Sequence, residues 1–396
     1  MSRPASPIKS AGSARAARHK DGTRLLALVQ RRPDVAPNQR FRHEQWAPHL
    51  ERAHGITMDF APFESTELAA LFEAPGRRVR KLLLAVRDSA RRWIRRHDAD
   101  RYDAVVVVRE ATMLGGAFVE RALAAKGVPL IYDFDDAIFL SSPDGASVST
   151  LLLRTPWKVA EICRLARAVT VGNDYLAAFA RRRNDNVHIV RTSIDLDRYK
   201  PQPERDASAP FTVVWSGSKS TLQYLDTVRP ALAALAGCVP AKLRVVCNAR
   251  PRPFEGIDME FVPWAPATEV AALADSDVGI MPLPDTETSR GKCALKALQY
   301  MAVGRAAVVS PVGMNRHVIR HNENGLLADD TTSWVSQLER LARDPALRRR
   351  LAASGRRTIE TGYSAEQSAR ALAGVVRNVL ATEGARPFLS QAVGAD

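Results

Sequence analysis

The sequence predicts an α/β protein made of two consecutive, doubly wound parallel-sheet domains. Three observations lead to this fold class. The chain has 396 residues, more than the ~250–300 at which a single hydrophobic core usually stops growing. Its 46% hydrophobic and 25% charged residues are ordinary globular values. Short apolar runs alternate with helical segments, which is typical of parallel sheets covered by helices on both faces.

The first half of the chain contains six predicted strands. Each is a short run of mainly branched apolar residues bounded by polar ones, as expected of a buried strand. Helical patterns lie between them, including one over 41–55 that stops at Gly55 because glycine commonly follows a helix end. The six strands are predicted at 24–29, 56–60, 103–108, 128–134, 168–171 and 187–190.

The alternation restarts after a proline-containing segment without apolar periodicity, which marks a linker. The strands predicted beyond it are 211–215, 243–247, 259–262, 277–281 and 306–310, with helices over 222–236, 266–274 and 291–302 and others to about residue 380. The chain is therefore divided into a disordered basic tail (1–22), a first domain (23–192), a linker (193–209), a second domain (210–364), a C-terminal helix (365–382) and a tail (383–396). Sites in such sheets lie at the carboxyl ends of the strands, so the two domains should face a shared cleft.

The net charge of +14 is unevenly distributed. Residues 1–200 hold 34 basic and 23 acidic side chains, and the rest hold 23 and 20. This asymmetry favours an anionic partner near the first domain. Segment 76–101 predicts a basic helix with an apolar stripe at Leu82, Leu83, Val86, Ala90, Trp93 and Ile94. It could bind anionic headgroups or be the solvated face of a helix packed on the sheet, whereas no nucleic-acid-binding signature accompanies it.

Cysteine usage and hydropathy exclude several classes of protein. The four cysteines form no C-x-x-C pair, which argues against a disulfide framework and a zinc ribbon. No apolar run approaches the ~18 residues that cross a bilayer, and the N-terminus lacks the apolar core of a secretory signal. We expect a cytoplasmic protein, with peripheral contact to the inner face of the cell membrane as an additional hypothesis.

The segment RGKCALKALQYMAVGRAAVVSPVG (290–313) carries the strongest chemical signal. In a helix that starts near Gly291, the side chains of Lys292, Lys296 and Gln299 share one face. Two lysines at the positive end of a helix suit a diphosphate, and the amide suits a ribose. The alternative is an ordinary amphipathic helix with solvated lysines.

A second signal is VVWSGSKSTLQYL (213–225), a strand that runs into a hydroxyl-rich turn and a helix. Glycine allows close backbone approach, and a helix N-terminus favours an anion. The spacing differs from a Walker A loop and from G-x-G-x-x-G. Serine and threonine are also common helix N-caps, which is the structural alternative.

Acidic residues end two strands of the first domain. IYDFDDAIF (131–139) could be a metal-binding D-x-D motif, a phosphatase nucleophile or a structural acidic turn in the cleft. VVVVREA ends another strand with Arg109 and Glu110. A strand-end glutamate in a cleft can serve as a base or an acceptor-binding group, and a surface ion pair is the alternative.

These residues together resemble glycosyltransferase family 4. The resemblance covers roughly residues 24–380 and rests on VVWSGSKSTLQYL, FVPWAP, DVGIMPLPD, GKCALKALQYMAVGRAAVVSPVGMN, NGLLADD, YDFDDAIF and TVGNDYLAAFA. It implies a GT-B fold of two Rossmann-like domains and a C-terminal helix near 365–380 that crosses back to the first domain. It also implies a retaining, hexosyltransferase-like transfer from a nucleotide sugar without a metal or other cofactor.

The resemblance also implies residue roles. Gly217, Ser218 and Lys219 would lie beside the diphosphate, and Trp264 would lie beside the base. Lys292 and Lys296 would neutralise the leaving phosphate. The full donor-binding set would be Gly217, Ser218, Lys219, Trp264, Gly291, Lys292, Lys296 and Gln299. The family's two glutamates in E-x7-E correspond to the uncharged Gly291 and Gln299. The donor sugar can therefore not be inferred from the family.

The first domain should bind the acceptor. We predict Arg40, Arg42, Arg109 and Asp136 as acceptor-binding residues, and Glu110, Asp133 and Lys292 as catalytic residues. The expected acceptor is a glycan or a lipid-linked molecule in cell-surface polysaccharide or glycolipid synthesis, with no nucleic-acid partner. The missing glutamates leave one alternative, a non-catalytic GT-B-like protein that binds nucleotide sugars or serves as a scaffold.

Overall fold

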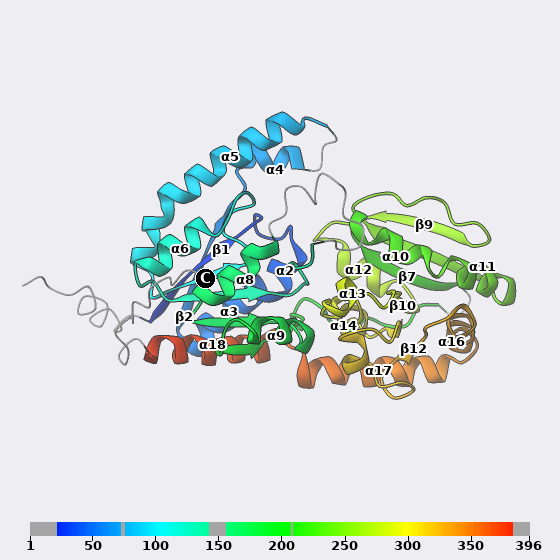
Figure 1. The fold of residues 1–396 in the computed structure, drawn as a ribbon. Coiled ribbons are helices and arrows are strands. Elements are labelled where there is room, and N and C mark those ends of the chain that lie inside the picture. Colours follow the sequence, from blue (N-terminus) through cyan, green and yellow to red (C-terminus); the bar gives the residue numbers. More distant parts are fainter. Residues whose placement is uncertain (1–21, 73–75, 142–155, 207–208, 383–396) are drawn as a thin grey trace, which may run out of the picture.

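Two six-stranded sheets lie side by side in the computed structural model, each covered by helices (Figure 1). The structure describes residues 22–72, 76–141, 156–206 and 209–382. The predicted tails 1–22 and 383–396 therefore lie outside the described residues, apart from Gly22. Of the helices in these ranges, none combines the length and the apolar character that a bilayer crossing requires.

The first sheet has the strand order β2-β1-β3-β4-β5-β6, and every pair is parallel. Its strands are β1 (Thr23–Val29), β2 (Ile56–Pro62), β3 (Ala104–Val108), β4 (Leu130–Phe134), β5 (Ala168–Val171) and β6 (Val187–Ile189). The helices around it are α2 (Pro37–Gln39), the π-helical turn η1 (Arg40–Glu44), α3 (Gln45–His54), α4 (Thr66–Phe72), α5 (Arg78–Ile94), η2 (Arg95–Arg101), α6 (Phe118–Ala125), α8 (Pro156–Leu165) and α9 (Asp174–Arg181).

The second sheet has the order β12-β11-β10-β7-β8-β9 and is also parallel throughout. Its strands are β7 (Phe211–Gly217), β8 (Ala241–Cys247), β9 (Asp258–Pro263), β10 (Val278–Met281), β11 (Ala306–Val309) and β12 (Leu326–Leu327). Its helices are η3 (Lys219–Thr221), α10 (Leu222–Asp226), α11 (Arg229–Cys238), α12 (Glu269–Ala274), α13 (Glu287–Arg290), α14 (Leu295–Ala302), α15 (Asn315–Val318), α16 (Thr331–Arg343) and α17 (Pro345–Gly362).

The predicted fold class is confirmed, and two predicted helices are wrong in detail. The helix expected over 222–236 is broken into α10 and α11, because Pro230 would clash with the preceding turn of a continuous helix. The helix expected from Gly291 begins only at Leu295, after Ala294 in a left-handed conformation with φ of 57°. The strand β12 lacked a detectable pattern because it has only two residues.

The chain crosses between the domains twice. Segment 190–210 leads from β6 to β7, and α18 (Ala365–Ala381) returns beneath the first sheet (Figure 1). The two crossings are joined where Ala365 N donates to Ile194 O at 2.9 Å. Leu372, Val376 and the other apolar residues of α18 pack in one core with Leu25, Trp46 and Leu50 of the first domain. The burial of these side chains attaches α18 to the first domain.

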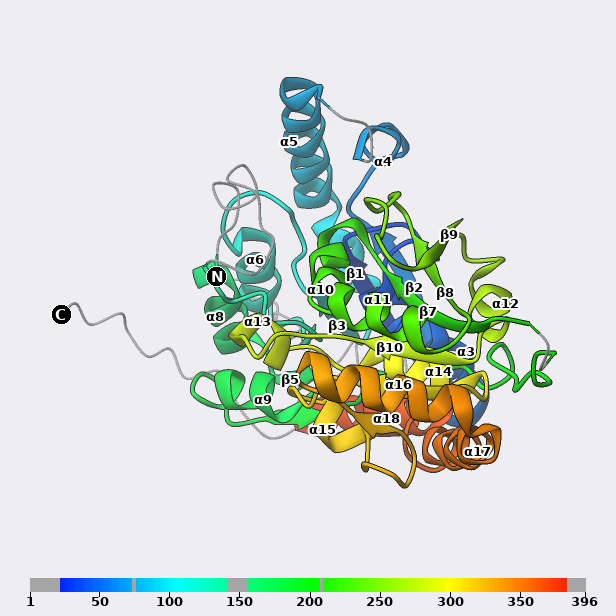
Figure 2. The same cartoon turned by 90° about the vertical axis from the view of Figure 1, so that its right-hand side faces the viewer.

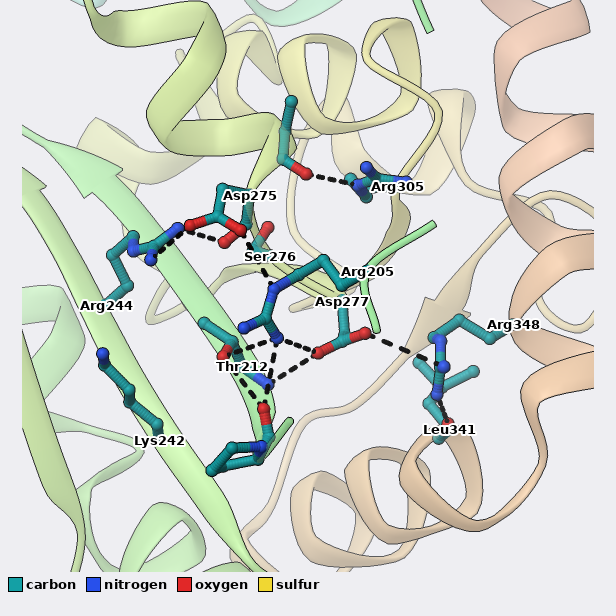
Figure 3. A network of polar contacts seen from close by, with 12 residues as sticks. Arg205, Thr212, Lys242, Arg244, Asp275, Ser276, Asp277, Arg305, Leu341 and Arg348 are labelled. Carbon is teal, nitrogen blue, oxygen red and sulfur yellow. Dashed lines mark hydrogen bonds and ion pairs between the residues drawn. The ribbon is translucent and has the colours of Figure 1, made fainter. Parts of the chain in front are cut away.

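Arg205 anchors the end of the first crossing to the second sheet (Figure 3). Its guanidinium donates to Asp277 Oδ2 at 2.8 Å and to Thr212 Oγ1 at 2.9 Å. Asp277 also accepts from Thr212 N. These bonds lie at the amino ends of β7 and β10, so the network stabilises the sheet at the edge remote from the predicted cleft.

Candidate functional site

The topology of the second sheet places a candidate site at one point. Strand order reverses between β7 and β10, which run side by side although β8 and β9 separate them in sequence. Loops from two such neighbouring strands leave in opposite directions and open a crevice at their carboxyl ends. The segments after Gly217 and Met281 border this crevice, which is where the sequence predicted the donor.

Tyr300 fixes helix α14 at this crevice. Ser216 N donates to the Tyr300 hydroxyl at 2.9 Å, and the hydroxyl donates to Ile280 O at 3.2 Å. The ring packs so closely on Gly279 that a Cβ there would lie 2.1 Å from it. One buried side chain of α14 therefore bonds to both strands of the reversal, and α14 is held beside their carboxyl ends.

Lys292 and Lys296 lie at this position without an anionic partner. Neither ammonium forms a hydrogen bond or an ion pair with any residue in the described ranges. The Lys292 ammonium lies 5.5 Å from the centre of the Tyr224 ring. Burial and then the charge of Lys292 lower the pKa of Lys296 to about 8. Two partly desolvated, mutually repelling cations form a site that would be stabilised by an anion.

The turn after β7 provides the second part of the crevice. At Gly217 an added Cβ would lie 2.1 Å from the Trp215 ring and 2.8 Å from Thr221 Oγ1, so only glycine fits. Ser218 N donates to Thr221 Oγ1 at 3.0 Å, and Lys219 N donates to Asn248 Oδ1 at 2.9 Å. These bonds shape the turn into a capping box at the start of a helical segment. The roles of Gly217, Ser218 and Lys219 at a diphosphate stay predictions.

The pKa of Lys296 predicts a pH-dependent affinity for anions. In the free protein Lys296 loses its charge as the pH rises through about 8. We expect the affinity for a nucleoside diphosphate to be level below this pH and to fall above it, by up to about tenfold per pH unit. Calorimetric titration with a nucleoside diphosphate between neutral pH and pH values above the transition would measure this.

Lys296→Arg is the matched variant for this prediction, because arginine stays charged across the whole range. It should retain its affinity for the nucleoside diphosphate at high pH, where the natural protein loses it. Equal losses in the two proteins would assign the pH dependence to another group and contradict the prediction.

A buried polar cluster lies beneath the crevice. The carboxylate of Glu269 accepts from Tyr199 Oη at 2.7 Å and from Trp264 Nε1 at 2.9 Å, and it pairs with Arg40 of the first domain. Gln299 Nε2 donates to the Tyr199 hydroxyl at 3.0 Å. The charge of Arg40 and these hydrogen bonds outweigh burial and lower the pKa of Glu269. The hydrogen bond to Glu269 thereby holds the partly exposed side chain of Trp264 in place.

This cluster changes the interpretation of Gln299 and Arg40. Gln299 is 2% exposed, so a direct ribose contact conflicts with its position. Arg40 is equally buried, with its guanidinium 5.3 Å from the centre of the Trp264 ring, and its buried Nη1 has no hydrogen-bond partner among the described residues. Arg40 thus joins the two domains at Glu269, and its predicted acceptor contact stays a prediction.

The first domain carries a charged group at the carboxyl ends of β3 and β4. Arg109, with a left-handed backbone at φ 63°, ion-pairs with Asp135 Oδ1 at 3.1 Å and with Asp136 Oδ2 at 3.6 Å. Asp136 is close enough to Lys296 of the second domain to favour its charged form. Glu110 lies next along the chain, 3.5 Å from the buried Lys158, and burial raises its pKa. Arg109, Glu110 and Asp136 keep their predicted roles as proposals.

Two predicted residues are not open to a substrate. Asp133 and Arg42 are at most 1% exposed and pair with each other, Arg42 Nη2 donating to Asp133 Oδ1 at 2.6 Å. His43 Nε2 and Thr170 Oγ1 complete the surroundings of the carboxylate at 2.9 and 2.6 Å. The predicted catalytic role of Asp133 and the acceptor contact of Arg42 are therefore corrected: this pair stabilises the interior of the first domain.

Gly291 lies in a contact between the domains. An added Cβ would lie 2.6 Å from the Ala137 Cβ, so a glutamate at this position would not fit. Asn173 of the first domain donates from Nδ2 to Gly291 O at 3.1 Å and to Lys292 O at 3.2 Å. Cys293 inserts against Gly172, where a Cβ would lie 2.2 Å from its Sγ. The turn that carries Lys292 is thus held by both domains.

Sequence reasoning missed the residues that support this site. Asn173 and Tyr300 lie within motifs quoted for the resemblance, but no role was inferred for them, and Tyr199 and Glu269 lie outside those motifs. Asparagine is a common helix N-cap, and this signal could have identified Asn173, whose side chain accepts from Leu176 N at 2.9 Å. Across the ranges described, no three His, Cys, Asp or Glu side chains gather closely enough to hold a metal ion. Independence from metal stays a prediction.

Comparison with known proteins gives one matching family and several relatives of similar fold. Residues 212–344 match the family model described as glycosyl transferases group 1. A stretch of 201 residues is 27% identical to a D-inositol 3-phosphate glycosyltransferase of Xylanimonas cellulosilytica. This match takes in 43% of the present chain and 46% of that relative, so it spans about half of the relative's length.

Solved structures share the architecture over nearly the whole chain. A sucrose-phosphate synthase from Thermosynechococcus elongatus superposes with a TM-score of 0.65 at 15% identity, covering 91% of this chain and all of that one. The Anabaena protein Alr3699/HepE, solved in complex with UDP-glucose, superposes with a TM-score of 0.60 at 12% identity, covering 90% of this chain and 99% of that one. At these identities the likeness establishes the fold.

Proposed function

We propose that this GT-B chain, whose second domain matches the glycosyl transferases group 1, moves a hexose from a nucleotide sugar to a glycan or lipid-linked acceptor. We further propose retention at the anomeric carbon, and a role in making cell-surface polysaccharide or glycolipid. The fold and the family match support glycosyl transfer in general. The nucleotide sugar is supported by the chemistry of the crevice and by the UDP-glucose complex of the Anabaena protein.

One observation carries the proposal: Lys292 and Lys296 lie at the strand reversal of the second domain, and neither forms an ion pair with a residue that the structure describes. When a sugar–phosphate bond breaks, negative charge develops on the leaving diphosphate. Cations held in position before the reaction stabilise that charge without reorganisation. Two lysines could supply the neutralisation that a divalent ion supplies in other transferases, so no cofactor is needed in this mechanism.

We assign the acceptor to the first domain. The charge of Asp136 favours the charged form of Lys296, and burial raises the pKa of Glu110, which follows Arg109 in the chain. A carboxylate can align an acceptor hydroxyl or accept its proton. Bringing both substrates into one cleft between two joined domains supplies the proximity component of catalysis.

Ligand-dependent thermal unfolding tests the proposed donor, since a ligand that binds only the folded state raises apparent stability. UDP-glucose is the first probe, followed by other UDP-, GDP- and ADP-sugars. We expect one donor to raise the unfolding temperature of the natural protein, to have little effect on Lys292→Met, and to be hydrolysed slowly without an acceptor. If no donor in the panel does so, the proposal fails.

The non-catalytic alternative is favoured by one observation, the absence of both E-x7-E carboxylates at Gly291 and Gln299. It predicts stabilisation by a nucleotide sugar together with no hydrolysis above that of a heat-denatured sample. Adding a lipid-phosphate acceptor would then give no sugar transfer. Turnover of the nucleotide sugar therefore distinguishes the two functions, because both predict that the nucleotide sugar binds.

A further inference from the structure

Helix α5 is packed on the protein through a face that contains both apolar and charged residues. Leu84, Ala85, Asp88 and Arg92 are its buried residues. Asp88 Oδ2 accepts from Ser65 N at 2.8 Å, and Arg92 Nη2 donates to Ala61 O at 2.8 Å. Hydrogen bonds of buried charged groups, as well as apolar contact, thus attach the helix to the first domain. Figure 2 shows α5 standing out from the body of the molecule.

The apolar stripe of α5 faces the opposite way. Val79, Leu82, Leu83, Val86 and Ile94 are 73%, 47%, 63%, 54% and 69% exposed. At ~100° per residue they fall within an arc of about 120°, centred roughly opposite the buried face. With Trp93, these residues are six of the eight large apolar side chains that are exposed in the described ranges. A surface helix normally turns such a stripe toward the core, so this arrangement requires a partner.

Basic side chains border the stripe. Arg78, Arg80, Arg87 and Arg95 are exposed. The side chains of Arg78 and Arg80 make no hydrogen bond or ion pair with any described residue. Residues 1–100 together carry 20 basic and 11 acidic side chains. An apolar stripe bordered by exposed cations matches an anionic lipid surface, with apolar side chains in the acyl region and arginines at the headgroups.

We propose that the outward face of α5 binds an anionic membrane surface, with the helix lying in the plane of the headgroups. A second copy of this chain is a poorer occupant, because a symmetric contact would bring the arginines of both copies together. Trp157, 56% exposed, packs on Gly116 next to Phe118, whose ring centre lies 5.8 Å from that of Trp93. A second aromatic side chain therefore lies close to the Trp93 end of the stripe, as suits an interface. The inference goes beyond the proposed transfer reaction and does not depend on it.

Sedimentation of the full chain with vesicles tests the proposal. The probes are vesicles of equal parts phosphatidylcholine and phosphatidylglycerol, and vesicles of phosphatidylcholine alone. We expect binding to the anionic vesicles at low salt and much less at high salt, where charges are screened. The combined variant Leu82→Ser, Leu83→Ser, Val86→Ser and Ile94→Ser should bind at least about tenfold more weakly. Its thermal unfolding should be unchanged, because these side chains are exposed.

Two controls make the result specific to α5. Val35→Ser removes an exposed apolar side chain elsewhere and should have no effect. Arg78→Gln with Arg80→Gln should weaken anionic-vesicle binding more than Arg252→Gln with Arg357→Gln, which removes two exposed arginines of the second domain. The proposal is overturned if the natural chain does not bind anionic vesicles at low salt, or if the four-serine variant binds as well. It is also overturned if that variant only converts a dimer to a monomer.

Discussion

Lys292→Met should lower kcat/KM for sugar transfer by about 10²–10³-fold, the usual loss when one preorganised group that stabilises a developing anion is removed. Methionine preserves the length of the side chain and removes its charge. The backbone of Lys292 is held by Asn173 and its ammonium makes no ion pair with a described residue. The folded structure should therefore change little. Steady-state rates with the donor identified by thermal unfolding would measure the loss.

Lys200→Met is the matched control, since Lys200 is an exposed lysine outside the cleft. Lys200→Met should be as active as the natural protein. Lys292→Arg should be more active than Lys292→Met, because arginine keeps the positive charge. If Lys292→Met were as active as Lys200→Met, the diphosphate would have to be stabilised elsewhere, and the assignment of the crevice would be wrong.

The fold was predictable because its signals are local. Runs such as 104–108 are apolar throughout, which is the pattern of a short strand buried on both faces. The alternation of strands and helices restarts at Phe211. This restart was enough to divide the chain into two sheets before any contact between distant residues was known. Local signals failed where a single residue overrides the pattern, as Pro230 and the left-handed Ala294 do in the two misjudged helices.

The candidate site was predictable only in part, because much of it depends on contacts between distant segments. Lys292 and Lys296 were found from their spacing, and Tyr300 was not, since its role appears only when β7 and β10 are neighbours. Gly291 could be identified as a departure from the family. That Ala137 occupies the space of a side chain there could be learned only from the packed domains.

The orientation of α5 shows a further limit of sequence. Periodicity identifies the apolar stripe of an amphipathic helix and gives no information on what the stripe contacts. The usual expectation, that the apolar stripe packs on the domain, is contradicted because the stripe is exposed, and Leu84, Ala85, Asp88 and Arg92 form the buried face. Which face of such a helix is buried can be recognised only once its neighbours are known.

Asp133→Asn should lower the stability of the first domain by about 3–5 kcal/mol, the usual effect of removing one partner of a buried ion pair. The amide is nearly the same size as the carboxylate, so the packing is kept. Its charge is lost, and Arg42 stays in the interior with a reduced set of acceptors. At about 2–4 °C per kcal/mol for a domain of this size, the unfolding temperature should fall by at least about 6 °C.

Asp59→Asn is the matched control, because Asp59 forms a half-exposed pair with Arg24 at 3.0 Å and surface pairs contribute ~0–1 kcal/mol.

The pH dependence of stability gives a second test of the Asp133 prediction. Arg42 and His43 hold the pKa of Asp133 well below its ordinary value against the effect of burial. Its contribution is therefore complete above the unfolded pKa of about 4 and is lost as the pH falls toward the lower folded pKa. Natural protein and Asp133→Asn should thus converge in stability on acidification. A variant that keeps natural stability and loses only activity would restore Asp133 to a catalytic role.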